Sequence, residues 1–416
     1  RGALMVANEA TSCVQKKGTK TVVALAAALV CGAVSAVEVA NTEITSEGET
    51  PAWTTESEIV FAAPSTTVEV KYDGSANSSA LHVTDAELTI NNGASGSVTF
   101  QSTTEKTDTA SSTPGSAYNA IVVGKGGSLT IETGTLTIGQ KDGEQNGGDR
   151  GIRLIGSGNT LTILADTINS ITGDEFVHVR EGDGSSVANI GTEDRRIKNF
   201  YAKTAWGKDD YGVGILQANE GNTINFWAET AEFDGSLNDE GGVFSSASAG
   251  TINVDANSLT IKGNLCGTYG MQTGDNFKDD QFNLKVRADS LDLQGGIRAG
   301  SSDSGYSTNV RNAYINLQAQ SGTITGDIVA YKRGHISIEG TGEQPLTITG
   351  HVLATTVKGT DKTTIGTGDV SLKNVTITSS DENAAVTAEK GTSFNFENFT
   401  INGDIAVDAE GIMNAS

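Results

Sequence analysis

The stretch INVDANSLTIKG, from Ile252 to Gly263, contains the pattern that decides the fold. Apolar residues alternate with polar ones at Ile252 and Val254, and again at Leu259 and Ile261, before a glycine closes the segment. An alternation with a period of two places one set of side chains on each face of an extended strand. The stretch therefore predicts two short β-strands, each with one buried and one solvated face, followed by a turn.

The same phrase recurs on both sides of this stretch. Related versions open at Leu161, Ile224, Phe282 and Tyr314, and the glycines that close such units follow one another at intervals of 24 to 34 residues. These closing glycines are Gly139, Gly173, Gly207, Gly235, Gly263, Gly295, Gly326 and Gly350. A third apolar stretch follows several of them, for example FVHV, VGIL, GGVF or GGIRA. Self-similarity at a nearly fixed short period is the signature of a repeat architecture.

Three short strands in each repeat predict an all-β fold, a right-handed parallel β-helix in which every repeat winds one coil. Coils would stack about 4.8 Å apart, with inward apolar side chains in columns and outward Thr, Asn and Asp in polar ladders. The glycines fit turns that need a positive φ or close backbone packing. The alternative is a string of β-sandwich domains joined by hairpins, for which Asn91-Asn92-Gly93 is the one good turn signal. After residue 40 the best helical segment, Asp381 to Lys390, is short.

A short apolar segment near the start of the chain predicts export. The 13 residues from Val22 to Val34 are all apolar or glycine, whereas a membrane-spanning helix needs roughly 20. Small residues follow the segment, and the basic residues Lys16, Lys17 and Lys20 precede it. This layout predicts a signal peptide over residues 1–36, cleaved between Ala36 and Val37. A retained anchor, or a lipoprotein acylated at Cys31, are the weaker alternatives.

Composition restricts the class of partner. The chain has 416 residues, 51 of them glycine and 4 proline, and a formal net charge of −23. An acidic surface disfavours nucleic acid and anionic membranes. Cleavage after Ala36 would remove Cys13 and Cys31 and leave Cys266 alone, so we expect an exported chain without a disulfide.

A signal peptide followed by a Cys-poor solenoid rich in Gly, Asn and Thr resembles the passenger region of a Gram-negative autotransporter, the type V secretion family. The resemblance covers most of residues 37–416. The polar segment Gln101–Tyr118 is interpreted as a loop or linker, so we expect an N-terminal cap with the first coils and a polar linker over 37–117, and a β-helix repeat region over 118–416. The resemblance also implies an outer-membrane barrel translocator as a partner, beyond residue 416. The expected location is the outer surface of a Gram-negative cell, or the medium around it.

Motifs for catalysis are not found in the sequence. The strings GDGSS (182–186) and SDSGYS (302–307) are near misses of the serine-protease motif G-D-S-G-S of some passengers. The four histidines, His82, His178, His335 and His351, lie in no metal or catalytic motif and are interpreted as surface or turn residues. We therefore expect no enzyme activity, no metal and no cofactor.

Candidate binding residues gather near residues 201–227 and 279–280. Aromatic rings on a solenoid face can stack on sugars, and β-helix lyases and hydrolases collect Asp, Arg and Lys across neighbouring coils. The candidates are Tyr201, Trp206, Asp209, Asp210, Tyr211, Trp227, Asp279 and Asp280. The first hypothesis is a structural or adhesive passenger that binds a protein or glycan. The alternative is a carbohydrate-active, pectate-lyase-like β-helix enzyme, which needs a cleft with converging carboxylates.

Overall fold

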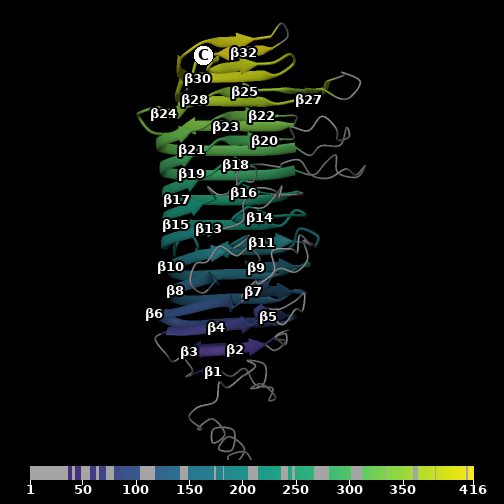
Figure 1. Ribbon diagram of the computed structural model, residues 1–416, viewed down its shortest axis with the longest axis vertical. Coiled ribbons are helices and arrows are strands. Elements are labelled where there is room, and N and C mark those ends of the chain that lie inside the picture. The colour runs from purple at the N-terminus through teal and green to yellow at the C-terminus, as the bar shows by residue number, and fades with distance from the viewer. Residues whose placement is uncertain are drawn as a thin grey trace, which may run out of the picture.

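The chain forms an elongated stack of β-strands, from β1 at one end to β32 at the other (Figure 1). The structure is a computed structural model, and within its described residues every helix-or-strand element is a strand. It describes residues 36–39, 43–47, 57–61, 65–71, 79–103, 118–140, 149–172, 175–180, 182–204, 214–235, 242–245, 249–266, 281–300, 312–331, 333–358, 364–379, 381–408 and 411–416. The predicted signal peptide thus lies outside the described residues, except for Ala36.

One sheet of 18 strands runs the length of the rod. Its strands are β1 (Ala36–Val39), β2 (Glu43–Glu47), β3 (Ser57–Phe61), β4 (Ser65–Lys71), β6 (Glu87–Thr103), β8 (Ser128–Gln140), β10 (Thr160–Thr172), β12 (Val187–Ile190), β13 (Ile197–Thr204), β15 (Thr223–Asp234), β17 (Gly250–Lys262), β19 (Gln281–Gln294), β21 (Asn312–Thr325), β23 (Gly334–Gly340), β24 (Leu346–Thr349), β28 (Asp369–Thr378), β30 (Ser393–Asn402) and β32 (Ile412–Ala415).

Two six-stranded sheets of short strands close the coils on the remaining side. The first contains β5 (Ser79–Thr84), β7 (Tyr118–Gly124), β9 (Asp149–Ile155), β11 (Val177–Arg180), β14 (Leu216–Ala218) and β16 (Phe244–Ser245). The second contains β18 (Leu265–Cys266), β20 (Ile297–Ala299), β22 (Ile328–Ala330), β25 (Val352–Ala354), β29 (Val386–Ala388) and β31 (Ile405–Val407). A hydrogen bond of 2.8 Å from Val243 N to Asn264 O joins the two sheets.

Each long strand covers two sides of the rod because it bends once. In β17 the alternation of buried and half-exposed residues breaks at Asn257 and Ser258, which are both exposed. Pairing with β15 also skips Asn257 and its counterpart Glu229. We call the part of each coil before this bend the first face, the part after it the second face, and the short strands the third face. The prediction of a parallel β-helix with three strands per coil is confirmed, although the first two strands usually run on as one.

Parallel pairing sets the length of the rod. Along the first face, 13 successive parallel pairings connect described strands from β1 to β32. At about 4.8 Å per step these pairings span roughly 60 Å. β6 and β8 remain paired on both sides of a register shift between Asn91 and Ser97.

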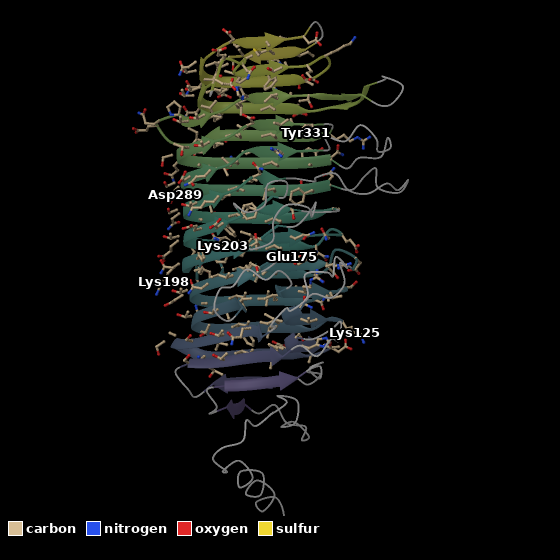
Figure 2. The ribbon with its side chains drawn as sticks, viewed as in Figure 1. Lys125, Glu175, Lys198, Lys203, Asp289 and Tyr331 are labelled. Carbon is tan, nitrogen blue, oxygen red and sulfur yellow. The ribbon has the colours of Figure 1, made fainter. Side chains whose placement is uncertain are left out.

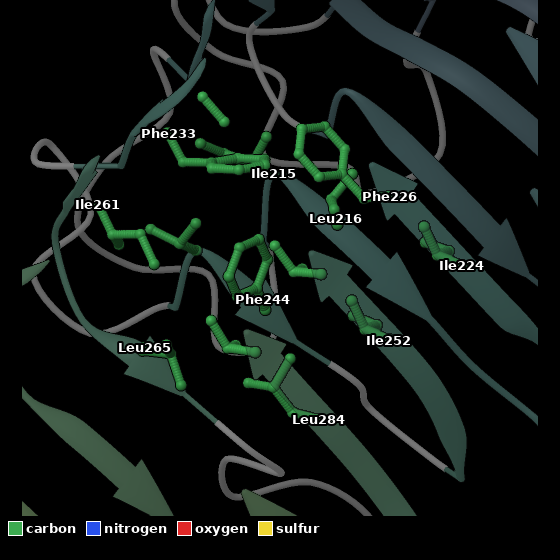
Figure 3. Close-up of a cluster of buried hydrophobic side chains, with 14 of the residues drawn as sticks. Ile215, Leu216, Ile224, Phe226, Phe233, Phe244, Ile252, Ile261, Leu265 and Leu284 are labelled. Atoms are coloured by element: carbon green, nitrogen blue, oxygen red, sulfur yellow. The ribbon is translucent and has the colours of Figure 1, made fainter. Parts of the chain in front are cut away.

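The core is a set of vertical columns of apolar side chains inside the coils, part of which Figure 3 shows. The register stacks Ile224, Ile252, Leu284, Ile315 and Ile336, each at most 1 % exposed. Since each coil buries the same positions as its neighbours, removing water from these columns is the main stabilising contribution available to the rod. The last inward position before the bend is an alanine in four successive coils, so a small side chain recurs there. These alanines are Ala228, Ala256, Ala288 and Ala319.

Closing glycines stack on one another at the turn between the second and third faces. A Cβ on Gly295 would lie 2.1 Å from the carbonyl oxygen of Gly263, and one on Gly350 would lie 2.4 Å from that of Gly326. Gly263 N also donates to Gln294 O at 3.0 Å. The recurring glycine is therefore required by the close approach of successive backbones, as the sequence predicted.

One local expectation is corrected by the structure. Asn91-Asn92-Gly93 does not form a hairpin: it lies inside β6, at the bend, where the pairing with β8 shifts register. The antiparallel pair among the described strands is instead β26 (Thr356–Lys358) with β27 (Thr364–Thr367). The asparagine–glycine sequence supplies a positive φ of 68° at Gly93 for a bulge rather than for a chain reversal.

Candidate functional site

A groove of about 280 Å³ crosses β15, β17, β19 and β21 on the first face. Its walls are the outward side chains of adjacent coils, and its floor is formed by the strands themselves. The lining residues are Phe226, Trp227, Asn253, Val254, Asp255, Lys285, Val286, Arg287, Asn316 and Gln318. Concave surfaces that combine an aromatic ring with a few polar groups are typical binding sites.

Register places the polar lining in two parallel columns. One column consists of Asn253, Lys285 and Asn316. The other consists of Trp227, Asp255, Arg287 and Gln318, each one coil above the last. Because the side chains project from a rigid ladder, their spacing is fixed before any ligand arrives.

Asp255 is held between two arginines. Arg196 Nη1 lies 2.8 Å from Asp255 Oδ1, and Arg287 Nη1 lies 3.4 Å from Asp255 Oδ2. Arg196 also donates hydrogen bonds to the carbonyl oxygens of Ala228 and Asp255, at 3.2 and 3.3 Å. These contacts hold the carboxylate in place. Arg196, Arg287 and Lys285 are the three positive charges around the one negative charge of Asp255.

A ladder of side-chain amides leads up to the groove. Asn225 Nδ2 donates to Asn189 Oδ1 at 3.0 Å, and Asn253 Nδ2 donates to Asn225 Oδ1 at 2.8 Å. Each amide is oriented by the one in the coil below, so the half-exposed Asn253 presents its remaining donor and acceptor sites in a defined direction.

Of the binding residues predicted from the sequence, the structure describes Tyr201 and Trp227. Trp227 lines the groove, half-buried on the first face. Tyr201 pairs with Glu232 on the second face, beyond the bend, so the two rings are not brought together. Burial, followed by the charge of Asp234, raises the pKa of Tyr201. The predicted residues Trp206, Asp209, Asp210, Tyr211, Asp279 and Asp280 lie outside the described residues.

The predicted cleavage residues are described only as backbone. Ala36 and Val37 begin β1, where they pair in parallel with Glu58 and Ile59 of β3. β1 is the first strand in the described part of the chain, and the predicted cleavage site lies between its first two residues.

Sequence reasoning missed Asp255, Lys285 and Arg287. Alignment of the repeats on their first apolar residue sets Phe282 against Ile252, whereas the structure pairs Ile252 with Leu284. Aligning the units on Gly235, Gly263, Gly295 and Gly326 instead gives the observed register, and would have predicted the column that contains Trp227, Asp255 and Arg287.

A second groove, of about 270 Å³, lies on the same face across β23, β28, β30 and β32. Lys373 lies there between two carboxylates, 3.4 Å from Glu339 and 3.3 Å from Glu397. Its single lysine is therefore neutralised by its neighbours, and the lining has a net negative charge.

The third face carries a buried polar cluster that contains His178. The interpretation of His178 as a surface or turn residue is therefore wrong. This histidine is 4 % exposed rather than on the surface. Its Nδ1 lies 2.8 Å from Glu175 Oε1, and its Nε2 lies 3.0 Å from Asn219 Nδ2. Arg153 Nη2 approaches the same carboxylate at 3.6 Å. The buried hydrogen-bonding partners explain how these polar side chains are accommodated here.

Other kinds of site are not found among the described residues. No cluster of His, Cys, Asp or Glu there could hold a metal ion. No helix in the described part of the chain has the length and apolar character needed to cross a bilayer. In comparisons with known proteins, no family model, no curated protein and no solved structure matches this chain.

Proposed function

We propose that the chain is a surface-displayed adhesive rod, similar to the passenger region of a Gram-negative autotransporter, that binds a glycan or protein on another cell. The groove at Trp227 on the first face carries this proposal. It combines an aromatic ring, amides and cations on a ladder that needs no rearrangement to bind, and preorganised surfaces lose little entropy on association. The length of about 60 Å fits a rod that holds such a groove away from a surface.

The export step is tested by locating the protein on intact cells. An epitope tag can be inserted between Glu343 and Gln344, which are exposed in the turn between β23 and β24. We expect antibody to label intact Gram-negative cells that express the full-length tagged protein, and external protease to remove the label. A matched variant without residues 1–36 should remain inside and unlabelled. Label found only after cells are broken would contradict the proposal.

A carbohydrate-active enzyme is the second candidate. One observation favours it: Asp255, Lys285 and Arg287 come from adjacent coils and line one open face. Glycoside hydrolysis, however, usually needs two carboxyl groups on either side of the bond. Asp255 is the only carboxylate in the lining of this groove, and two arginines occupy its oxygens.

Turnover of an acidic polysaccharide separates the two candidates. The adhesive proposal predicts no new reducing ends and no unsaturated products after prolonged incubation with the purified protein. Turnover that disappears in Asp255→Asn would favour the enzyme instead, provided that the variant keeps the strand-rich circular dichroism of the parent.

A further inference from the structure

The groove at Trp227 is cationic in a chain whose net charge is −23. In its lining Lys285 and Arg287 outnumber Asp255; beside it, Arg196 contacts Asp255, and Glu339 accepts a hydrogen bond from Gln318 at the far end. At physiological ionic strength charges are screened over about 8 Å, so a bound group responds mainly to these neighbours rather than to the whole rod. The groove can therefore attract an anion although the chain as a whole repels one.

Lys285 differs in its surroundings from four other lysines of the large sheet whose side chains the structure describes. Lys198, Lys203, Lys262 and Lys373 each lie within 4 Å of a carboxylate from a neighbouring coil, the longest of these contacts being 3.6 Å. Lys285 has Asn253 below it and Asn316 above it, and no ion pair with any described residue. Its ammonium group is exposed and has three donors for an external acceptor.

Arg287 adds a second cation two residues along the same strand. Its side chain is 66 % exposed, and its contact with Asp255 is long, at 3.4 Å. Most of its guanidinium donors are therefore open to solvent. Guanidinium groups bind carboxylates through paired hydrogen bonds, a geometry that a lysine beside it reinforces with charge.

Trp227 and the amides indicate what carries the anion. The half-buried indole offers an apolar surface on which the C–H face of a sugar ring can pack. Asn253 lies in the coil next to Trp227, and Asn316 and Gln318 lie in the coil beyond Lys285 and Arg287; side-chain amides both donate and accept, as sugar hydroxyls require. A small anion such as phosphate would leave both the ring and the amides without a role.

The spacing between coils is close to the repeat length of an extended polysaccharide. Adjacent rows of lining residues are about 4.8 Å apart, close to the length of one sugar in an extended polysaccharide. From these observations we propose that the groove binds a carboxylate-bearing polysaccharide laid along the rod axis, with its sugar on Trp227 and its carboxylates on Lys285 and Arg287. This rests on the proposed function, since it names the ligand class of the same face.

Calorimetric titration of the purified full chain tests the proposal with three probes that share a length. They are an oligogalacturonate hexamer, its full methyl ester and a sulfated hexasaccharide. We expect the hexamer to bind and the uncharged ester to bind at least about tenfold more weakly, because charge-assisted hydrogen bonds are lost. Binding of the acid should also weaken as salt is added.

Variants locate the bound ligand. Lys285→Gln and Trp227→Ala should each weaken binding of the acid about tenfold. Lys198→Gln removes the same charge from the exposed bend, where the lysine is paired with Asp166, and should change affinity less than about twofold. Figure 2 shows Lys198 at the edge of the rod. Circular dichroism confirms that all three variants keep the parent fold.

Several results would overturn the proposal. Acid and methyl ester that bind equally, or acid that binds equally to wild type and Lys285→Gln, would remove the carboxylate site. Tighter binding of the sulfated probe would assign the groove to sulfated glycans. Failure of all three probes to bind would also reject the site, whereas the adhesive proposal would still be judged independently by surface labelling of intact cells.

Discussion

Replacing Gly295 by alanine tests the stacked turns of the solenoid most severely. The added Cβ would lie 2.1 Å from Gly263 O and 2.4 Å from Gly263 C, both backbone atoms of the coil below. Neither atom can swing away as a flexible side chain can. Relieving the contact requires an increase in the local coil spacing and a weakening of ladder hydrogen bonds such as Gly263 N to Gln294 O. Overpacking of this kind costs about 1–3 kcal/mol, and we expect the upper half of that range.

Gly124→Ala is the matched control. A Cβ there would lie 3.5 Å from Ile155 O, an ordinary contact, and Gly124 has no positive φ. The substitution should stabilise the protein by about 0.4–1 kcal/mol, because it restricts the unfolded chain. The two glycine replacements are therefore predicted to have opposite signs.

Hydrogen exchange followed by mass spectrometry measures the effect coil by coil. A loss of about 2–3 kcal/mol should accelerate exchange roughly 30- to 150-fold in the peptides that contain β17 and β19. Peptides from β6 and β7 should change much less, because stability in a repeat array is summed over neighbours. Equal protection in Gly295→Ala and wild type, or equal losses in both alanine variants, would refute the stacking of these turns.

Three further substitutions, one of them with a control variant, test the core and one turn. Ile252→Asp should lower the free energy of unfolding in urea by several kcal/mol, because it buries an unpartnered charge. Ser258→Asp at the exposed bend should lower it by less than about 1 kcal/mol. Equal losses would contradict the register. Phe233→Ala should cost about 3–5 kcal/mol, since its ring packs against Phe200 and Phe244 with centroids 4.8 and 4.9 Å away; a cost below about 1 kcal/mol would exclude that packing. Burial lowers the pKa of His351, but hydrogen bonds to Asp327 and Asp381 raise it, and the net shift is upward. The stability that protonated His351 contributes to the fold is therefore complete below the unfolded-state pKa of about 6.5. It is lost as the pH rises through the pKa in the folded state. The stability difference between wild type and His351→Gln in urea should therefore be larger at about pH 5.5 than at about pH 8.5, and a difference that grew with pH would reverse this interpretation.

Much of the fold follows from the local sequence because each coil repeats the same short-range pattern. Ile252 and Leu259 were predicted to be inward from alternation alone, and they are 0 and 1 % exposed. Gly263 and Gly295 were predicted to lie at turns, and they stack there. A one-residue shift would have moved every apolar side chain to the outside, so burial fixes the register strongly.

The candidate site was harder to predict because it is formed between coils. Trp227, Asp255 and Arg287 are 28 and 32 residues apart along the chain, and only the pairing of β15, β17 and β19 joins them. The burial of His178 depends likewise on Glu175, Asn219 and their surroundings, since its alternation alone would place it on the outside of the third face. A polar residue at an outward position of a solenoid gives the same sequence pattern whether its side chain is buried or exposed to solvent.

The central claim is a rod of parallel coils with a ligand groove on its first face. A crystal structure of the protein with a bound oligogalacturonate hexamer would test both parts at once. We expect coils paired in the register Ile224–Ile252–Leu284, and sugar density over Trp227 with a carboxylate within hydrogen-bond distance of Lys285 or Arg287. A different register, or a hexamer bound at another face while this groove is left unoccupied, would contradict the account.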